Sequence, residues 1–463
     1  MSHSSRQAVV IGGSIGGLLA ARVLSERFDK VTIVERDELS DDFEPRKGAP
    51  QGRNVHVLFG GGVRVVESLF PGFFEELAAN GSVVCDFARD LCWYHGGVWK
   101  ARPASDLVSY WQSRPFLETH LRRRLLRDTK VEILNRTKVV ELTADADRKR
   151  ITGVDICDVN DASSVRSLPA ELVVDASGRG SVAPKWLESL GYESPAETTV
   201  EVNIGYSSRI YEPPAGERDW RIMALYGTPP HSKRTGYIFP IEGGRWLVSI
   251  VGFLKDFPPD DDEAYLEFAR TLELPDFYEA LREAKPLSAP TSFRFPANRW
   301  RHFESLKRFP AGFLVLGDAI STFNPVYGQG MSVCALEVDR LRSMLAKLPT
   351  GERVDDRFAL RFFRSAAQIV ATPWLLATQS DFLYPETVGR RSLQTRPLNW
   401  YFGRVLELCS GDQRVLDAFY GVLHFIQPPT ALFHPRIVWS VLKRAAGARS
   451  GFRGAKQRPQ PEA

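Results

Sequence analysis

The sequence predicts an α/β fold in which a parallel sheet is combined with an inserted antiparallel sheet and a helical C-terminal region. Three observations lead to this prediction. Residues 8–36 read as strand, glycine-rich turn, helix and strand; residues 200–301 change to alternating strand-like segments; and a buried strand of the first kind returns at residues 312–318. We expect four segments: residues 1–199 and 302–350 as two parts of one domain, 200–301 as an inserted β-sheet domain, and 351–463 as a helical region with a basic tail.

The first segment contains several further elements. Residues 8–12 predict a buried strand, about 16–28 a helix and 30–36 a second strand, which together make a βαβ unit. The elements expected after it are a helix near residues 63–69, an amphipathic basic helix over 114–128, paired strands in 131–145 and 151–159, and a buried strand ending in a glycine turn at 171–181.

The inserted segment and the segment after it are expected to contain different secondary structure. Strands are expected in residues 200–211 and 220–227, and a hairpin in 236–253 with Gly243 and Gly244 at its turn. After the strand at 312–318 a loop leads into a long helix, and the chain is mostly helical from Arg353 onward.

The opening turn reads Gly12-x-Ser14-x-x-Gly17, with further glycines at positions 13 and 16. In a dinucleotide fold, glycines at these positions allow the tight turn, the backbone approach to a pyrophosphate and close helix packing, but here serine takes the middle position. Glu35 lies at the end of the second strand, where an acid accepts ribose hydroxyls. The pattern indicates a nucleotide site; a glycine-rich packing turn is the alternative.

A second chemistry-bearing stretch is "GFLVLGDAISTFNPVYGQGM", residues 312–331. Asp318 follows a buried strand and could bind a polyol hydroxyl. A helix N-terminus is expected near Gly328–Gly330, where free N–H groups favour an anion. An N-cap aspartate with a simple turn is the alternative.

Composition excludes several classes of function. A net charge of +4 is too small to indicate nucleic-acid binding, and the spacing of the histidines and cysteines predicts no metal site. Five cysteines without a C-x-x-C pair favour a reducing, cytoplasmic compartment. Basic residues gather in the tail, which is expected to be a solvated end, with membrane contact as the alternative: Lys443, Arg444, Arg449, Arg453, Lys456 and Arg458, against Glu462.

Three segments resemble the FAD-binding signatures of the single-component flavin monooxygenases, the class of para-hydroxybenzoate hydroxylase and squalene epoxidase. They are "VIGGSIGGLLAARVLSERFDKVTIVERD", "VVDASGRGS" and "GFLVLGDAISTFNPVYGQGMSVCALEVDRL". Residues 45–72, "PRKGAPQGRNVHVLFGGGVRVVESLFPG", are similar to a bacterial subgroup with the epoxidases of polyether-antibiotic biosynthesis. The resemblance spans roughly residues 7–345. It implies a Rossmann-like FAD-binding domain with an inserted substrate-binding sheet, as in para-hydroxybenzoate hydroxylase.

The resemblance also implies site residues. It places the FAD pyrophosphate at the opening loop, the adenosine ribose at Glu35, the ribityl chain or pyrophosphate at Asp318 and the isoalloxazine along residues 327–331. The implied FAD contacts are Gly12, Gly13, Ser14, Ile15, Gly16, Gly17, Glu35, Arg36, Arg53, Arg114, Asp175, Gly178, Asp318, Gly328, Gly330 and Met331. For Arg53 and Arg114 a surface salt bridge is the alternative.

An aromatic pocket over the flavin is expected from the inserted sheet and the loop after Asp318. Its predicted members are His56, Tyr206, Tyr226, Tyr237, Phe239, Trp246, Phe323 and Pro325. Plain core packing is the alternative for the strand aromatics, and a structural role is the alternative for His56. No motif nominates a catalytic side chain.

The implied function is an FAD-dependent monooxygenase that uses O2, through a flavin C4a-hydroperoxide, to oxidise a large hydrophobic small molecule. Epoxidation of a polyketide or isoprenoid in secondary or antibiotic metabolism is expected; an aromatic hydroxylase, a geranylgeranyl-reductase-like oxidase or reductase, and a non-catalytic flavoprotein are the alternatives. No NADPH-binding domain is visible, so NAD(P)H would bind transiently or a separate flavin reductase would supply electrons. The W-x-W-x-x-I-P signature of flavin halogenases is absent.

Overall fold

A parallel sheet of five strands forms the centre of the first part of the computed structural model, which describes residues 5–447 and 458–461. The strand order is β18–β11–β1–β2–β7. The strands are short, mostly apolar and largely buried, which is typical of a parallel sheet covered on both faces. Their bounds are β1 Gln7–Ile11, β2 Lys30–Val34, β7 Val131–Leu134, β11 Leu172–Asp175 and β18 Phe313–Val315.

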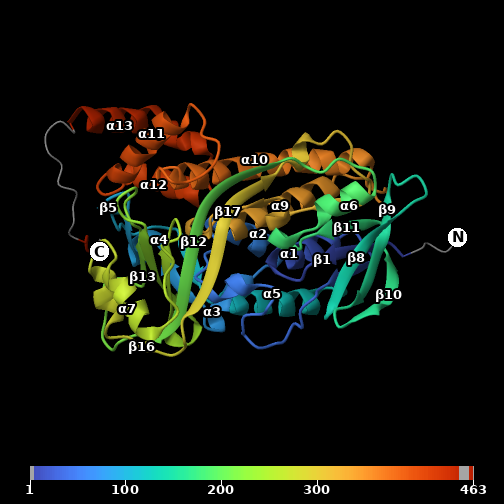
Figure 1. The fold of residues 1–463 in the computed structure, drawn as a ribbon, viewed down its shortest axis with the longest axis horizontal. Coiled ribbons are helices and arrows are strands. Elements are labelled where there is room, and N and C mark those ends of the chain that lie inside the picture. The colour runs from blue at the N-terminus through green and yellow to red at the C-terminus, as the bar shows by residue number, and fades with distance from the viewer. Residues whose placement is uncertain (1–4, 448–457, 462–463) are drawn as a thin grey trace.

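Helices α1 (Ile15–Leu24), α2 (Gly60–Leu69), α5 (Arg114–Asp128) and α9 (Gly330–Leu345) pack with this sheet and with one another (Figure 1). α1 ends four residues before the predicted end at residue 28. The amides of Glu26 and Arg27 bond to carbonyls three residues back, so the chain leaves the helix through tighter turns.

The larger sheet is chiefly antiparallel, and its principal strand order is β19–β17–β12–β15–β14–β13–β4–β5. The predicted hairpin at 236–253 is confirmed as β14 and β15, with Gly243 and Gly244 at positive φ. The bounds are β4 Leu91–His95, β5 Val98–Trp99, β12 Glu197–Glu212, β13 Ile222–Leu225, β14 Arg234–Ile241, β15 Arg245–Gly252, β16 Lys285–Pro286, β17 Thr291–Arg301 and β19 Ser321–Thr322.

Two smaller sheets complete the strand structure. β8 (Thr137–Ala144) pairs with β9 (Ile151–Asp158), which also pairs with β10 (Asp161–Pro169); β3 (Val83–Asp86) pairs with β6 (Val108–Trp111). The predicted strand at 131–145 is therefore divided: its first four residues form β7 of the parallel sheet, and the rest pairs with β9 as expected.

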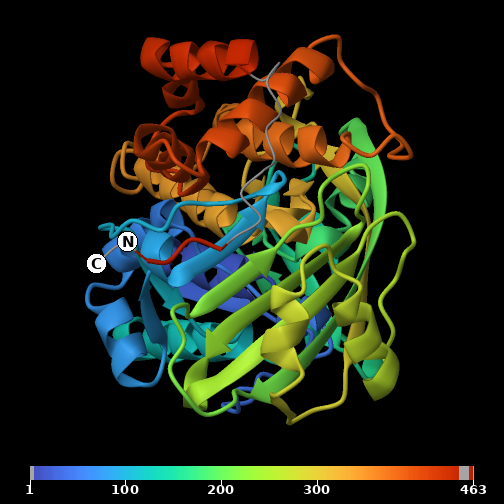
Figure 2. The ribbon, with the colours of Figure 1, turned by 90° about the vertical axis from the view of Figure 1, so that its left-hand side faces the viewer.

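Helices dominate the C-terminal region. They are α10 Asp356–Asp381, α11 Thr395–Leu408, α12 Gln413–Leu423 and α13 Pro435–Gly447. Figures 1 and 2 show α11, α12 and α13 as a block over one end of the larger sheet. Within residues 5–447 and 458–461, no helix combines the length and apolar character needed to cross a bilayer. Shorter helices lie elsewhere: α3 Phe73–Ala79, α4 Phe87–Asp90, α6 Ala183–Ser189, α7 Asp262–Arg270 and α8 Asp276–Leu281.

The predicted fold class is confirmed: a parallel-sheet domain, an antiparallel sheet and a helical C-terminal region are all present. The predicted domain boundaries at residues 199, 301 and 350 stay predictions. Two strands of the larger sheet, β4 and β5, come from the chain before residue 199.

The described end of the basic tail is not free. Arg458 donates a hydrogen bond to Asp219 Oδ1 at 2.9 Å, and the carbonyl of Pro459 accepts one from Arg102 Nη1 at 3.4 Å. The expectation of a solvated end is therefore wrong for Arg458 and Pro459, whereas Gln460 is exposed. Arg449, Arg453, Lys456 and Glu462 lie outside the described residues.

Candidate functional site

One cavity of about 990 Å³ extends from the carboxyl ends of β1 and β2 to the helical region, and it lies at the upper end of the usual ligand-pocket range of about 300–1,000 Å³. Its wall at one end includes the glycine loop and Glu35. At the other end the wall includes aromatic side chains of the larger sheet and of α11 and α12. The structure thus joins the predicted nucleotide loop and the predicted aromatic pocket in one cavity.

The glycine loop is held tightly against the start of α1. Gly12 has a φ of +100°, and a Cβ on Gly17 would lie 1.8 Å from the Gly12 carbonyl oxygen. Only glycine fits at position 17, so the loop and the helix approach closely. This arrangement presents the N-terminal backbone of α1 to the cavity, where it suits a pyrophosphate.

Ser14 is the N-cap residue of α1, but its hydroxyl makes no capping hydrogen bond. Instead it donates to Glu118 Oε2 at 2.7 Å and accepts from Arg114 Nη2 at 3.0 Å. Glu118 also accepts from Arg46 Nε at 2.9 Å. The serine therefore links the loop to α5, a contact that a glycine at this position would not make.

Glu35 is almost fully buried at the end of β2. Its Oε2 accepts from the Gly13 amide at 2.7 Å and lies 3.1 Å from Arg46 Nη1, and its Oε1 accepts from the Asp37 amide at 2.9 Å. A carboxylate oxygen can accept two hydrogen bonds, so Oε1 retains capacity for a ribose hydroxyl. Arg36 follows on the cavity wall.

Asp318 lines the same cavity, and no described residue donates a hydrogen bond to its carboxylate. Burial raises the pKa of Asp318, and the nearby Arg114 and Arg179 oppose part of that rise. Gly328, Gly330 and Met331 line the adjacent wall, where α9 begins. The carboxylate is thus available to accept from a polyol.

Sequence reasoning missed Glu337, which supports this turn from behind. Its side chain is fully buried in α9 and accepts from the Gly317 amide at 2.6 Å. Burial raises the pKa of Glu337 to about 8, and Asp318 adds to the rise. A signal was present, because Glu337 stands among the apolar positions Val333, Val338 and Leu341 of one helix face.

Asp175 and Gly178 both belong to the segment "VVDASGRGS", but only Gly178 lines the cavity. The fully buried Asp175 accepts from the Ser177 amide at 2.9 Å and from the Ser181 hydroxyl at 2.6 Å, so it shapes the turn rather than facing the cavity. Gly178 and Arg179 of that turn line the wall near Asp318.

The structure separates the two predicted arginines. Arg114 lies on the cavity wall and approaches His56 Nε2 at 3.1 Å, while His56 Nδ1 lies 2.9 Å from the Asn54 carbonyl oxygen. Burial lowers the pKa of His56 to about 3, and the Arg114 charge adds to this effect, so the imidazole is neutral. The placement of Arg53 is corrected: it ends a short 3₁₀ turn (Pro50–Arg53), is exposed and does not line the cavity.

Most of the predicted aromatic pocket is present at the far end. The side chains that line it are His56, Tyr206, Tyr226, Tyr237, Phe239, Phe323 and Pro325. Trp246 is a correction, because it packs against Trp220 in a separate core cluster. Strand side chains alternate between faces, and Trp246 pairs with Pro240, one position away from the cavity-lining Phe239.

Several cavity residues gave no signal in the sequence. They come from β4, β17 and the C-terminal helices: Trp93, His95, Phe293, Phe295, Leu406, Phe419 and Leu423. Only the tertiary contacts between these distant segments reveal them.

The turn Asn324–Tyr327 is held from two sides. Tyr226 and Tyr237 donate hydrogen bonds to the Val326 carbonyl oxygen at 2.8 and 3.2 Å. From the other side, the fully buried Asp381 at the end of α10 accepts from Asn324 Nδ2 at 2.8 Å and from the Tyr327 hydroxyl at 3.0 Å. This turn, part of the cavity wall, is therefore fixed by hydrogen bonds.

Asp381 was not predicted, and its environment is unusual. Its third partner is Asn298 Nδ2 at 2.7 Å, so all three donors to the carboxylate are uncharged. Burial raises the pKa of Asp381 to about 7, and these hydrogen bonds oppose only part of the rise. Through Tyr327 this carboxyl is connected to the cavity wall.

These contacts fit a dinucleotide at the loop end. The tight glycine loop, the buried Glu35 and the unpaired Asp318 carboxylate provide positions for a pyrophosphate, a ribose and a polyol, as FAD requires. Two of the buried polar atoms that have no hydrogen-bond partner are Asn54 Nδ2 and Gln329 Oε1. Both belong to residues that line this cavity.

No family model matches the chain. It is 34% identical over 386 residues to Protein Rv3254 of Mycobacterium tuberculosis, and the alignment covers 81% of this chain and 80% of the mycobacterial protein. The chain belongs to the Protein Rv3254 family.

Several solved structures share the fold of this member of the Protein Rv3254 family. A flavoprotein/dehydrogenase from Cytophaga hutchinsonii has a TM-score of 0.68 at 16% identity and covers 97% of this chain and 100% of its own. The p-nitrophenol 4-monooxygenase PnpA from Pseudomonas putida has a TM-score of 0.61 at 17% identity, with 92% and 99% covered. The flavin-dependent brominase Bmp2 has a TM-score of 0.66 at 14% identity, with 96% and 100% covered. At these identities the likeness establishes the fold.

Replacing Asp318 with alanine should weaken FAD binding roughly tenfold to a hundredfold, because a hydrogen bond to a charged group contributes about 1.5–3 kcal/mol. Titration of the apoprotein with FAD, followed by flavin fluorescence, measures the dissociation constant. Asp147→Ala, an exposed aspartate far from the cavity, is the matched control. Unchanged affinity in Asp318→Ala would remove Asp318 from the FAD site.

Proposed function

We propose that the chain is an FAD-dependent monooxygenase that transfers one oxygen atom of O2 to a large apolar substrate. The observation that carries the proposal is the single cavity, which connects the dinucleotide-type loop with an aromatic chamber. A cofactor at the loop and a substrate in the chamber would meet beside Asp318 and the turn Asn324–Tyr327.

In this proposal the loop from Gly12 to Gly17 holds the pyrophosphate, Glu35 the adenosine ribose and Asp318 the ribityl chain, while residues 328–331 follow the flavin ring. When bound and reduced, FAD supplies the activation of O2. The protein keeps water away with the aromatic wall and fixes the turn at Val326 through Tyr226 and Tyr237.

For the substrate we infer an alkene of a polyketide or isoprenoid, which would be epoxidised in secondary metabolism. The support is the chamber wall, which is built chiefly of aromatic and aliphatic side chains, and the neutral His56 beside it. An electron-rich alkene needs no protein base, so such a wall is sufficient for it. NAD(P)H or a separate reductase would supply the electrons.

Hydroxylation of a phenol is a second candidate, and Asp381 favours it. A phenol reacts faster when a base removes its proton, and a base titrating near neutral pH is well suited to this. Asp381 accepts a hydrogen bond from Tyr327, which lines the cavity, so a substrate proton could pass to this carboxyl along the tyrosine.

The deciding experiment incubates the FAD-loaded protein with NAD(P)H or a flavin reductase, ¹⁸O-labelled O2, and a panel of polyenes and phenols. We expect a product that is one labelled oxygen atom heavier, from a polyene if the protein is an epoxidase and from a phenol if it is a hydroxylase. Release of peroxide alone, or reduction of the substrate without oxygen incorporation, would contradict the proposal and favour an oxidase or reductase. A halogenated product in the presence of bromide or chloride would likewise contradict it.

A further inference from the structure

The outward face of α13 is unusually apolar for a helix at the surface. Ile437 and Val441 are buried beneath the helix, whereas Trp439 and Leu442 are 69% and 51% exposed. Figures 1 and 2 both show α13 as the outermost helix of its block. The helix therefore carries one apolar stripe for the core and a second that faces solvent.

Neighbouring elements extend this surface. Trp400 of α11 is 47% exposed, and Phe433, just before α13, is 45% exposed. α11 and the segment before α13 are in contact, since Tyr401 stacks on Phe433 with ring centroids 5.0 Å apart. We call Trp400, Phe433, Trp439 and Leu442 the cap face. Three of the four strongly exposed aromatic residues in the described chain belong to it.

The segment of chain that contains the cap face has an excess of positive charge. Residues 390–447 contain eight Lys and Arg residues against three Asp and Glu, whereas residues 1–389 contain 48 against 52. On α13 itself, the exposed Arg436 and Lys443 lie one turn from Trp439. Exposed tryptophan and leucine beside lysine and arginine are typical of helices that lie in the interface of an anionic membrane.

The part of the cap face on α11 is also the back of the cavity wall. α11 contributes Asn399, Phe402 and Leu406 to the cavity, while Trp400 of the same helix is exposed. A surface that contacted a bilayer here would bring the membrane within one helical layer of the proposed substrate chamber.

We propose that the cap face binds the surface of an anionic lipid bilayer, lying on it rather than crossing it. The apolar side chains would enter the headgroup region, and Arg436 and Lys443 would contact lipid phosphates. The delivery of apolar substrate from the bilayer to the cavity rests on the proposed function; the lipid binding itself does not.

Flotation of the full-length, FAD-loaded protein with vesicles tests the proposal. The vesicles are phosphatidylcholine alone and phosphatidylcholine with about 30% phosphatidylglycerol, at low and high salt. We expect binding to the anionic vesicles, weakened by salt, and a loss of about tenfold or more in Trp439→Ser/Leu442→Ser and in Arg436→Gln/Lys443→Gln.

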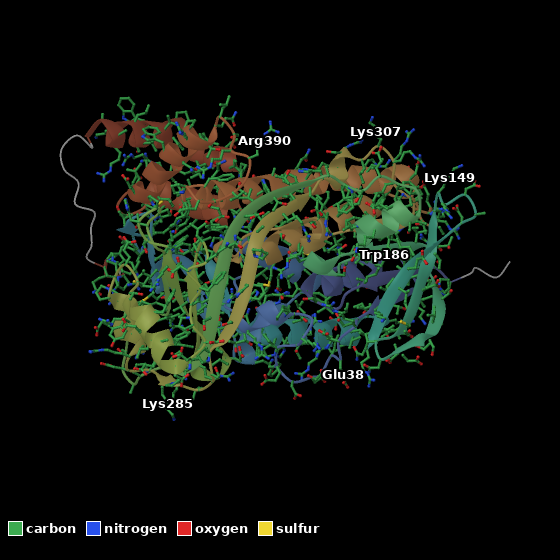
Figure 3. All side chains as sticks on the ribbon, in the orientation of Figure 1. Glu38, Lys149, Trp186, Lys285, Lys307 and Arg390 are labelled. Atoms are coloured by element: carbon green, nitrogen blue, oxygen red, sulfur yellow. The ribbon has the colours of Figure 1, made fainter. Side chains whose placement is uncertain are left out.

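Matched controls change the same kinds of residue elsewhere. Leu126→Ser/Val165→Ser removes exposed apolar side chains from α5 and β10, and Lys149→Gln/Lys307→Gln removes two charges at the opposite end of the molecule (Figure 3). Both should bind vesicles as the wild type does. Circular dichroism shows whether each variant is folded.

Three outcomes would overturn the proposal: no binding to either vesicle, equal loss in the control variants, or a dimer in light scattering that Trp439→Ser/Leu442→Ser abolishes. The last would assign the cap face to a second copy of the chain. Because flotation needs no turnover, failure here leaves the monooxygenase proposal standing, and failure of oxygen incorporation leaves lipid binding standing.

Discussion

Gly17→Ala should abolish detectable FAD binding and lower the free energy of unfolding by about 2 to 3 kcal/mol. The added Cβ would stand 1.8 Å from the Gly12 carbonyl oxygen, so the loop and α1 must separate. Backbone amides then move away from the pyrophosphate, and losing two hydrogen bonds to a charged group weakens binding at least about a hundredfold. The flavin content of the purified protein and urea unfolding of the apoprotein measure the two effects.

Gly403→Ala is the matched control, because a Cβ at this position of α11 meets no atom within 4 Å. Alanine is favoured over glycine inside a helix, so this variant should be stabilised by about 0.5–1 kcal/mol. If Gly17→Ala retained both its flavin and its stability, the tight turn would have no part in cofactor binding.

Asp381→Asn should change how stability depends on pH. In the folded protein burial raises the pKa of Asp381 from 3.8 to about 7, so between these values the folded state binds more protons than the unfolded state. The stabilisation from this carboxyl is complete below pH 4 and is lost as the pH rises to about 7. Relative to wild type, Asp381→Asn should therefore gain about 2 to 3 kcal/mol between pH 5 and pH 8.

Urea unfolding of the apoprotein at several pH values measures this difference, and other titrating groups cancel because both proteins contain them. Asp417→Asn is a control from the neighbouring α12, since its aspartate lies outside the Asn298–Asn324–Tyr327 network. Parallel pH profiles for wild type and Asp381→Asn would show that Asp381 is ionised throughout this range.

The glycine-loop end of the cavity, where we propose the cofactor binds, could largely be predicted from the sequence because its signals are local. Gly12, Gly17 and the start of α1 lie within a few residues of one another, and Glu35 follows at the end of the next strand. The turn itself demands glycine, so the requirement is visible without knowledge of the rest of the chain. Arg53 shows the limit of this reasoning, because its exposure depends on how the loop 41–59 folds back.

The chamber could be predicted only in part. Alternation along β14 is consistent with Tyr237 and Phe239 sharing a face. The sequence does not say which residues of the partner strand β15 share that face, and the prediction that Trp246 does is wrong. Trp93 is over 300 residues from Phe402 and Phe419 in the sequence, and an aromatic residue on a strand or helix has the same pattern in a core and in a cavity wall.

The sequence by itself determined the α/β fold class, the glycine loop, Glu35 and the Gly317–Asp318 turn, because each depends on backbone requirements within a short stretch of chain. Only the tertiary structure decided that Ser14 bonds to Glu118 and Arg114, that Asp381 is buried against Asn298, Asn324 and Tyr327, and that the cap face is exposed. Those properties arise from the burial and the partners that distant segments provide, and no local pattern specifies them.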